Sequence, residues 1–435
     1  MANTYLTRTP SSTTNRKTFT ISMWLKRSKL GATTGITLQG VNSGNDDFAI
    51  YFGSADDLQT FSWSGSSEQF TLTTNRKFRD VSAWYHIVVS VDTTQGTAAD
   101  RVKLYINGVQ ETSFATANYP SQNADLEYND TSALWVGRSY GGHYFEGAIS
   151  HYHSIDGTAY DASAFGSTDA TTGEWKINTS PSVTYGTNGF FILKDGNSVT
   201  DQSGQSNNFT ANGTLTKTED SPSNVFATLN AITPSSNNNR AGGTRHFNNS
   251  GTYDMRHSTL AVSKGKWYAE FYMADMTGGF TQVGIQDTTQ FNDYSFMTNS
   301  SRGYGYLKDG TKRNASSISS YGDTFTSGDY IGVAVDLDNN KIYFSKNGVW
   351  QNSGDPTSGA TGTGSAFDIA DGYDYCIATS SNDAGTDQIT DVNFGNGYFN
   401  VNAVSSAGTN ASGNGIFEYD VPTGYTALST KGLNL

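Results

Sequence analysis

Hydrophobic and polar residues alternate along short segments of this chain, the pattern of strands that bury one face. Residues 84–92 (WYHIVVSVD) and 101–109 (RVKLYINGV) are two such segments, separated by a short polar loop. Asn107-Gly108 closes the second segment, and this pair favours the positive φ angles of a type I′ hairpin turn. The pattern therefore predicts a strand, a loop and an Asn-Gly hairpin in the first half of the chain.

The same order of elements returns about 240 residues later. Residues 330–338 (YIGVAVDLD) alternate, and residues 341–350 (KIYFSKNGVW) follow with Asn347-Gly348 at the turn. Helical periodicity is hard to find anywhere in the chain. We therefore expect an all-β protein with two related β-sandwich domains.

Polar, turn-rich stretches divide the chain. We place the first sandwich in residues 1–200 and a polar connector in residues 201–224, which could also wrap along the surface of the first domain. The second sandwich is expected in residues 225–404, and residues 405–435 are expected to form a C-terminal tail or docking segment.

Composition narrows the possible functions. The 435 residues include 47 glycines, 25 tyrosines and 24 phenylalanines, with a formal charge of −13. An acidic chain without runs of Lys or Arg is a poor partner for nucleic acid, and no apolar run reaches the length of a membrane span. The first residues lack the apolar core of a secretory signal, and the single Cys376 excludes an intrachain disulfide. We expect synthesis in a reducing cytoplasm and a buried Cys376.

Two groups of motifs resemble known families. Residues 19–28 (FTISMWLKRS) and 145–166 (FEGAISHYHSIDGTAYDASAFG) resemble laminin-G/concanavalin A-like jelly rolls. Residues 265–273 (GKWYAEFYM) and 328–350 (GDYIGVAVDLDNNKIYFSKNGVW) resemble a SPRY domain. The resemblance implies two concanavalin-like antiparallel β-sandwiches in tandem, followed by a short C-terminal segment.

The order of the parts resembles an architecture of tailed bacteriophages, especially marine ones. The motifs that carry this resemblance are YLTRTPSSTTNRKTF near the start, DSPSNVFATLNAITP at residues 220–234 and PTGYTALSTKGLNL at the end. It implies a protein of the virion surface, on tail or capsid, made in the host cytoplasm. Its partners would be a host cell-surface glycan or protein and other virion proteins, and it would form a homo-oligomer, a trimer by analogy with fibre proteins.

Catalysis is the first alternative to weigh. Retaining glycosidases need two carboxylates about 5–5.5 Å apart, and the jelly-roll glucanases that resemble this fold place them on one strand as E-x-D-x-x-E. Of the eight glutamates, no two lie within fifteen positions of each other, so that motif is absent. A cross-strand Asp pair stays open. Residues 137–141 (GRSYG) fit the letters G-x-S-x-G, but strand-like residues follow, so we expect a hairpin and no catalytic residue.

Metal binding is the second alternative. His151 and His153 fall on one side of an alternating strand, but no third ligand is evident. Laminin-G sandwiches often carry calcium at the rim, and four aspartates are candidates by residue type only. We therefore assign no metal and no other cofactor. The four aspartates are Asp46, Asp47, Asp125 and Asp130.

Aromatic residues in polar loops indicate carbohydrate binding, because a sugar face stacks on an aromatic ring while short polar groups fix its hydroxyls. Trp24, Trp84, Trp267 and Trp350 lie within strand patterns and are expected to be structural. The candidate ligand-binding residues are Trp63, Tyr140, His143, Phe291, Tyr294, Tyr304 and Tyr306.

The resemblance to phage proteins, together with the loop aromatics and the missing catalytic motif, implies a non-enzymatic phage surface protein of the tail-fibre or tip type that recognises host-surface glycans. The alternative is a purely structural capsid decoration or adaptor protein. A polysaccharide depolymerase is the third hypothesis.

Overall fold

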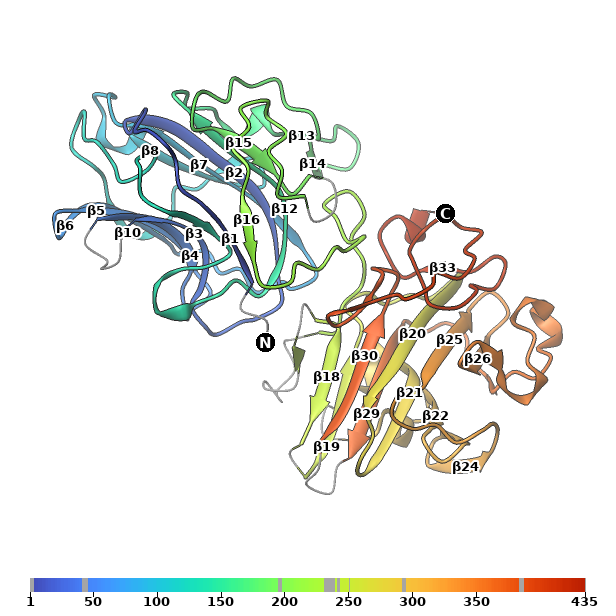
Figure 1. Cartoon of the computed structure of the whole chain (residues 1–435). Coiled ribbons are helices and arrows are strands. Elements are labelled where there is room, and N and C mark those ends of the chain that lie inside the picture. Colours follow the sequence, from blue (N-terminus) through green and yellow to red (C-terminus); the bar gives the residue numbers. More distant parts are fainter. Residues whose placement is uncertain are drawn as a thin grey trace. The chain divides into compact units, whose positions relative to one another are not determined.

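The computed structural model describes residues 4–40, 46–194, 198–230, 239–240, 243–249, 251–291, 295–382 and 387–434. The chain divides into two compact units, Met1–Lys217 and Thr218–Leu435, here called the first and the second domain. They run from blue to green and from yellow-green to red in Figure 1, and each is described by itself.

The first domain is a sandwich of two antiparallel sheets. One has eight strands in the order β10-β6-β5-β4-β3-β11-β1-β16, and the other has six in the order β15-β12-β2-β7-β8-β9. The strands of the larger sheet are β10 (Phe114–Asn118), β6 (Ser67–Thr74), β5 (Leu58–Ser64), β4 (Asp47–Phe52), β3 (Thr34–Gly40), β11 (Leu134–Val136), β1 (Tyr5–Arg8) and β16 (Thr210–Asn212). Those of the smaller are β15 (Phe190–Ile192), β12 (Gly147–Asp156), β2 (Thr18–Arg27), β7 (Trp84–Asp92), β8 (Val102–Ile106) and β9 (Val109–Gln110). A separate hairpin, β13 (Gly166–Thr168) and β14 (Trp175–Ile177), and the 3-10 turns η1 (Ala98–Asp100), η2 (Tyr140–Gly142) and η3 (Ala162–Ala164) complete the domain.

Alternation along these strands builds the first core. Ile21 on β2 lies opposite Val89 on β7, Met23 lies opposite Ile87, and all four side chains are fully buried. Because successive side chains of a strand point to opposite faces, every second residue enters the space between the sheets. Burial of such aliphatic side chains is the main stabilising contribution, at about 1.5–3 kcal/mol each.

The second domain is also a sandwich of two sheets. One has the order β17-β18-β30-β20-β25-β26-β27, with β28 beside β26 and β33 beside β20, and the other has the order β19-β29-β21-β22-β23-β24. The strands of the first are β17 (Asn239–Arg240), β18 (Arg245–Asn248), β30 (Gln388–Asn393), β20 (Lys266–Asp275), β25 (Tyr330–Asp336), β26 (Lys341–Lys346), β27 (Val349–Trp350), β28 (Phe367–Asp368) and β33 (Thr426–Ala427). Those of the second are β19 (Tyr253–His257), β29 (Tyr375–Asn382), β21 (Phe280–Asp287), β22 (Gly303–Leu307), β23 (Thr311–Asn314) and β24 (Ser317–Ser320). The pair β31 (Tyr398–Phe399) and β32 (Asn402–Ala403) and the 3-10 turns η4 (Thr288–Gln290), η5 (Met297–Asn299), η6 (Gln351–Ser353), η7 (Pro356–Thr361) and η8 (Gly432–Asn434) complete it.

Both predicted Asn-Gly hairpins are present. Asn107 and Gly108 have φ angles of 48° and 80°, and Asn347 and Gly348 have 49° and 80°, as a type I′ turn requires. In each hairpin the asparagine side chain also accepts a hydrogen bond from the preceding strand. The Asn107 Oδ1 atom accepts from the His86 N–H, and the Asn347 Oδ1 atom accepts from the Tyr330 N–H, both at 2.8 Å.

The segments predicted as connector and tail have defined places in the two domains. Strand β16, within the connector range, pairs with β1 and so belongs to the first domain. Strand β33, within the C-terminal range, pairs in parallel with β20, and Phe417 and Tyr425 pack in a buried cluster beside it. Strands account for 44% of the structure and helices for 6%, so the predicted all-β tandem of sandwiches is confirmed.

Candidate functional site

A loop of the second domain lies directly on one sheet, and glycines make this contact possible. On β22, Tyr304 and Tyr306 point into the core, so Gly303 and Gly305 face the other way. A Cβ atom added to Gly305 would lie 2.7 Å from the Thr298 Cγ2 atom. The absence of side chains at these glycines therefore lets the loop that contains η5 settle against the sheet.

Side chains from three strands hold this loop in place. The Thr298 hydroxyl donates to the Gln282 Oε1 atom at 2.7 Å, and the Met297 N–H donates to the Ser380 hydroxyl at 3.3 Å. The Met297 side chain packs in a small buried cluster with Met255 on β19. The loop is thus fixed to β21, β29 and β19.

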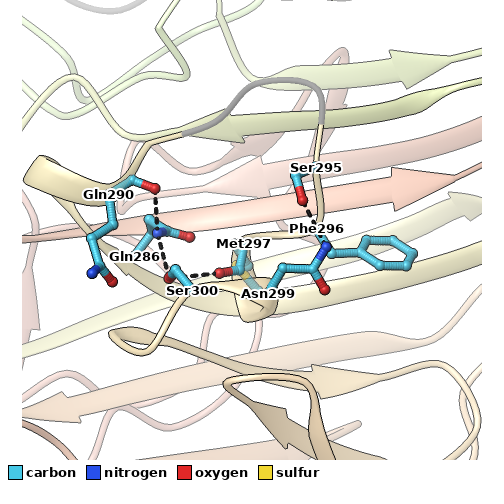
Figure 2. A pocket seen from close by; sticks show the side chains of 7 residues that line it. All are labelled: Gln286, Gln290, Ser295, Phe296, Met297, Asn299 and Ser300. Atoms are coloured by element: carbon cyan, nitrogen blue, oxygen red, sulfur yellow. Dashed lines mark hydrogen bonds between the residues drawn. The ribbon is translucent and has the colours of Figure 1, made fainter.

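A small pocket opens between the end of β21 and this loop (Figure 2). Side-chain amides and hydroxyls supply most of its polar atoms, one aromatic ring lines it, and none of the described lining residues is charged. Its lining residues are Gln286, Gln290, Ser295, Phe296, Met297, Asn299 and Ser300.

Gln286 is the central polar residue of this pocket. Its side chain is 1% exposed, and its Nε2 atom donates to the Gln290 carbonyl at 3.0 Å and to the Ser300 hydroxyl at 2.8 Å. Its Oε1 atom is buried and accepts no hydrogen bond from any residue that the structure describes. A buried acceptor without a donor costs about 1–3 kcal/mol, which a ligand N–H or O–H would recover. The pocket therefore suits a neutral polar group.

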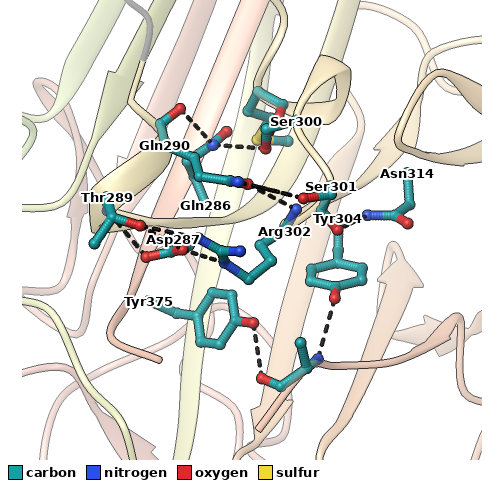
Figure 3. A network of polar contacts seen from close by, with 12 residues as sticks. Gln286, Asp287, Thr289, Gln290, Ser300, Ser301, Arg302, Tyr304, Asn314 and Tyr375 are labelled. Carbon is teal, nitrogen blue, oxygen red and sulfur yellow. Dashed lines mark hydrogen bonds and ion pairs between the residues drawn. The ribbon is translucent and has the colours of Figure 1, made fainter. Parts of the chain in front are cut away.

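A polar network around Arg302 lies beside the pocket and fixes one of its lining residues, Gln290 (Figure 3). The Arg302 guanidinium forms an ion pair with Asp287 and donates to the Thr289 hydroxyl at 3.0 Å, and it stacks over the Tyr373 ring at 4.0 Å. Burial alone would raise the pKa of Asp287, but hydrogen bonds from Thr289 and Arg302 lower it below its ordinary value. The Arg302 N–H also donates to the Gln290 Oε1 atom at 3.0 Å, which fixes this pocket residue.

Two tyrosines predicted to bind ligand in the second domain lie in its core instead. Tyr304 is 5% exposed and its hydroxyl accepts from the Ala370 N–H at 3.1 Å. Tyr306 is fully buried and its hydroxyl donates to the Asp323 carbonyl. Neither ring offers a face to a sugar, which corrects the expectation for both.

The other two predicted residues of the second domain have different outcomes. Phe291 is half-buried and stacks on His257, with ring centroids 3.8 Å apart, at the edge of the pocket loop. Tyr294 lies outside the described residues. Sequence reasoning missed Gln286, although its place in VGIQD, two residues after the outward-facing Gly284, would have put it on the loop-covered face.

In the first domain the structure brings Trp63 and Tyr140 to one carboxylate. Half-buried Trp63 lies on β5 directly opposite Asp47 on β4, and not in a loop as expected. Burial, and then the charge of Asp46, raise the pKa of Asp47 to about 6, while a hydrogen bond from Tyr140 opposes the shift. His143 is exposed at the end of η2, in the same hairpin as Tyr140.

The G-x-S-x-G segment is the hairpin that the sequence predicts. Arg138 pairs with Tyr144 in an antiparallel bridge, and the Ser139 N–H donates to the His143 carbonyl at 2.9 Å. After Ser139 come only the 3-10 turn η2 and then β12. The strand–turn–helix geometry of a nucleophile elbow is therefore not formed here.

Most of the residues considered for metal binding have partners within the protein. The His153 Nδ1 atom lies 2.9 Å from the Tyr185 hydroxyl, and the His151 Nδ1 atom lies 2.7 Å from the Ser150 hydroxyl. Asp130 accepts from the Gln39 side chain at 3.0 Å, while Asp125 is exposed. Within the described ranges, no group of three or more His, Cys, Asp or Glu side chains is arranged to hold a metal ion. Nor does any described helix have the length and hydropathy to cross a membrane.

The predicted structural residues occupy buried positions. Trp24, Trp84 and Trp267 are 4%, 6% and 4% exposed, and Trp350 is half-buried against a core cluster. Cys376 is buried, and burial raises the pKa of its thiol to about 12. These outcomes agree with the expectation from strand alternation.

Comparison with known proteins identifies both domains by type. Residues 1–159 match the Concanavalin A-like lectin/glucanases superfamily, and residues 266–367 match the SPRY domain. The ATP-dependent RNA helicase DDX1 of Xenopus laevis is 35% identical over 91 residues. That alignment spans 21% of this chain and only 12% of the helicase's length.

Several solved structures resemble parts of the chain. The SPRY domain of human HERC1 is 18% identical with a TM-score of 0.28 and covers 34% of this chain and 87% of its own. Another human SPRY domain is 17% identical with a TM-score of 0.24, covering 34% and 95%. A heptameric SAP-like pentraxin from Limulus polyphemus is 16% identical with a TM-score of 0.27, covering 36% and 71%. From the two domain matches, the chain carries a concanavalin A-like lectin/glucanase-type domain followed by a SPRY domain.

Proposed function

We propose that this chain is a non-catalytic binding protein of a tailed-phage virion, of the tail-fibre or tip type, that attaches to host-surface glycans. The observation that carries the proposal is the pairing of a concanavalin A-like domain with a SPRY domain, since domains of both types are typically non-catalytic binding domains. The phage assignment rests on the motif resemblance of the two ends and of residues 220–234.

The pocket beside η5 supports a binding role for the second domain. Its neutral lining and the unpaired Gln286 Oε1 atom suit a sugar hydroxyl or a peptide N–H, and Phe296 offers an apolar surface beside them. A single site of this size would bind weakly. Several copies on one particle would raise the avidity by about 10²–10⁴.

A purely structural decoration or adaptor is the second candidate function. SPRY-type domains bind proteins, so the second domain could dock on a neighbouring virion protein while the first faces the host. A trimeric assembly, by analogy with fibre proteins, is part of the first proposal only.

Two measurements on purified particles and cells separate these functions. Quantitative mass spectrometry gives the copy number, for which we expect a few to a few tens per virion. The purified full chain should bind host cells and compete with phage adsorption, and Gln286→Met should weaken this competition if the pocket takes part. Hundreds of copies per virion without cell binding would favour the decoration, and absence from the particle would overturn the virion assignment.

A further inference from the structure

One arginine of the first domain is surrounded by aromatic rings. The Arg138 guanidinium lies over the rings of Trp135 at 4.4 Å, Tyr5 at 4.8 Å and Tyr144 at 5.4 Å. Tyr5 also contacts both other rings, with centroid distances of 6.0 Å each. Trp135 projects from the outer face of the eight-stranded sheet, because its strand neighbours Leu134 and Val136 enter the core.

Arg138 differs from the other arginines of its domain in its hydrogen bonding. Of seven arginines in residues 1–217, the other six donate to carboxylate, amide or carbonyl oxygens of the protein. The Arg138 side chain forms no hydrogen bond or ion pair with a described residue. Its Nε atom is buried without an acceptor, and the two terminal nitrogens do not share that burial, so the end of the guanidinium reaches the surface.

The surroundings keep this charged group in one orientation. Three ring faces hold the guanidinium plane by cation–π contacts, which are strongest where water is excluded. The Arg138–Tyr144 bridge fixes the backbone at both sides of the hairpin, and Gly141 and Gly142 turn the chain at its tip with φ angles of 66° and 73°. The Arg138 guanidinium therefore has a fixed orientation, and its N–H donors have no acceptor among the described residues.

We propose that Arg138 and its ring cluster bind the carboxylate of an acidic, uronic-acid-type saccharide. A guanidinium matches a planar carboxylate through two parallel N–H···O bonds, and aromatic rings beside it offer apolar surface to the sugar. Exposed His143 stands in the same hairpin and contributes a further polar contact to the saccharide. This inference rests on the proposed glycan-binding function and names its ligand class.

The net negative charge of the chain supports a role for one particular cation in binding an acidic glycan. With a net charge of −13, the protein repels polyanions at long range, so recognition of an acidic glycan needs a local, uncompensated cation. Arg138 is such a cation, whereas Lys29 of the same domain forms an ion pair with Glu146 at 2.7 Å.

The test uses the purified full chain and three soluble probes: trigalacturonate, the same trisaccharide with its carboxyl groups reduced to alcohols, and inorganic phosphate. We expect trigalacturonate, followed by calorimetry and by the change in tryptophan fluorescence, to bind at least tenfold more tightly than the reduced trisaccharide. Arg138→Lys should lose about tenfold and Arg138→Met more, whereas the matched variant Arg79→Met, at an exposed arginine paired with Asp56, should bind as the wild type does.

The comparison of acidic and reduced probes needs no variant, so it holds even if Arg138→Met fails to fold. Equal binding of both trisaccharides would overturn the role of the carboxylate, and phosphate binding as tight as trigalacturonate would overturn the saccharide class. If the chain binds host cells but no acidic trisaccharide, this inference fails and the proposed function stands. If it binds no host cell, the proposed function fails.

Discussion

Glu270 on β20 accepts a hydrogen bond from the backbone N–H of Tyr419, at 2.9 Å, and this contact fastens the C-terminal segment to the second domain. The neighbouring Glu418 N–H donates to the other oxygen at 2.8 Å, and the Tyr268 hydroxyl donates at 3.0 Å. Glu270 is fully buried. The Glu270 carboxylate thus accepts the two backbone N–H groups of residues 418 and 419, which would otherwise need the carbonyl oxygens of a neighbouring strand.

Replacing this carboxylate should loosen the C-terminal segment. Glu270→Gln leaves one oxygen for two N–H donors, so we expect the second domain to lose about 2 kcal/mol of unfolding free energy. Limited proteolysis should then cleave residues 405–425 sooner than in the wild type. Glu68→Gln, at an exposed carboxylate, is the control and should change neither result. Wild-type proteolysis and unfolding of Glu270→Gln would contradict the docking role.

A fall in pH should change the stability of the two domains in opposite directions. Burial lowers the pKa of His86 from 6.5 to about 3, and the ring stays neutral, held by a 3.0 Å hydrogen bond from Trp175. The unfolded chain takes up this proton near its ordinary pKa, so the first domain loses stability as the pH falls from about 6.5 towards 3.

Burial raises the pKa of Glu270 from 4.5 to about 7. The folded second domain therefore holds more protons than the unfolded chain between these values, and its stability rises as the pH falls from about 7 to 4.5. Differential scanning calorimetry at pH 7 and pH 5 should resolve the two effects, with one transition moving down and the other up. In Glu270→Gln the upward movement should disappear. Parallel movement of both wild-type transitions would refute the assignment.

The two hairpins offer matched substitutions. Proline cannot adopt the φ of 48° at Asn107 or 49° at Asn347, and it lacks the N–H that each donates to the preceding strand at 2.9 Å and 2.8 Å. We expect Asn107→Pro to destabilise the first domain, and Asn347→Pro the second, by about 3 kcal/mol or more. Each variant serves as the control for the other in calorimetry. Wild-type unfolding of both would undercut the sandwich assignment.

The pocket loop should be sensitive to Gly305. In Gly305→Val the new side chain meets Thr298 and Met297, at 2.7 Å and 2.9 Å from the Cβ position, so the loop must move. We expect a loss of about 1–3 kcal/mol in the second domain and faster amide exchange in residues 295–300. Gly96→Val, where an added Cβ meets no atom within 4 Å, should unfold as the wild type does. Unchanged exchange in Gly305→Val would mean that the loop does not rest on the sheet.

Strand alternation made most of the fold predictable, because it reports local geometry. The cross-strand neighbours Ile21 and Val89 and the turn residues Asn107 and Asn347 could all be located from their spacing. In GYGYL, glycines alternate with tyrosines, and the same alternation places Tyr304 on the core face of β22, whereas the polar residues around it suggest a loop.

The sites depend on contacts between distant segments, which spacing does not reveal. The unpaired state of the Gln286 oxygen follows from a loop that folds back onto β21, and the ring cluster of Arg138 brings Tyr5 to residues 135–144. The sequence indicates Trp63 and Tyr140 only as aromatic residues of polar loops. They share a contact with Asp47 only because β4 and the η2 hairpin meet in three dimensions.

The central claim, that this chain binds host-surface glycan without cleaving it, has one direct test. Purified full-length protein is incubated with polysaccharide extracted from the host surface, and bound protein and newly formed reducing ends are measured in the same sample. The account predicts saturable binding with no increase in reducing ends over hours. Release of reducing ends that is abolished by substituting aspartates in one cleft would contradict it, as would the absence of any binding.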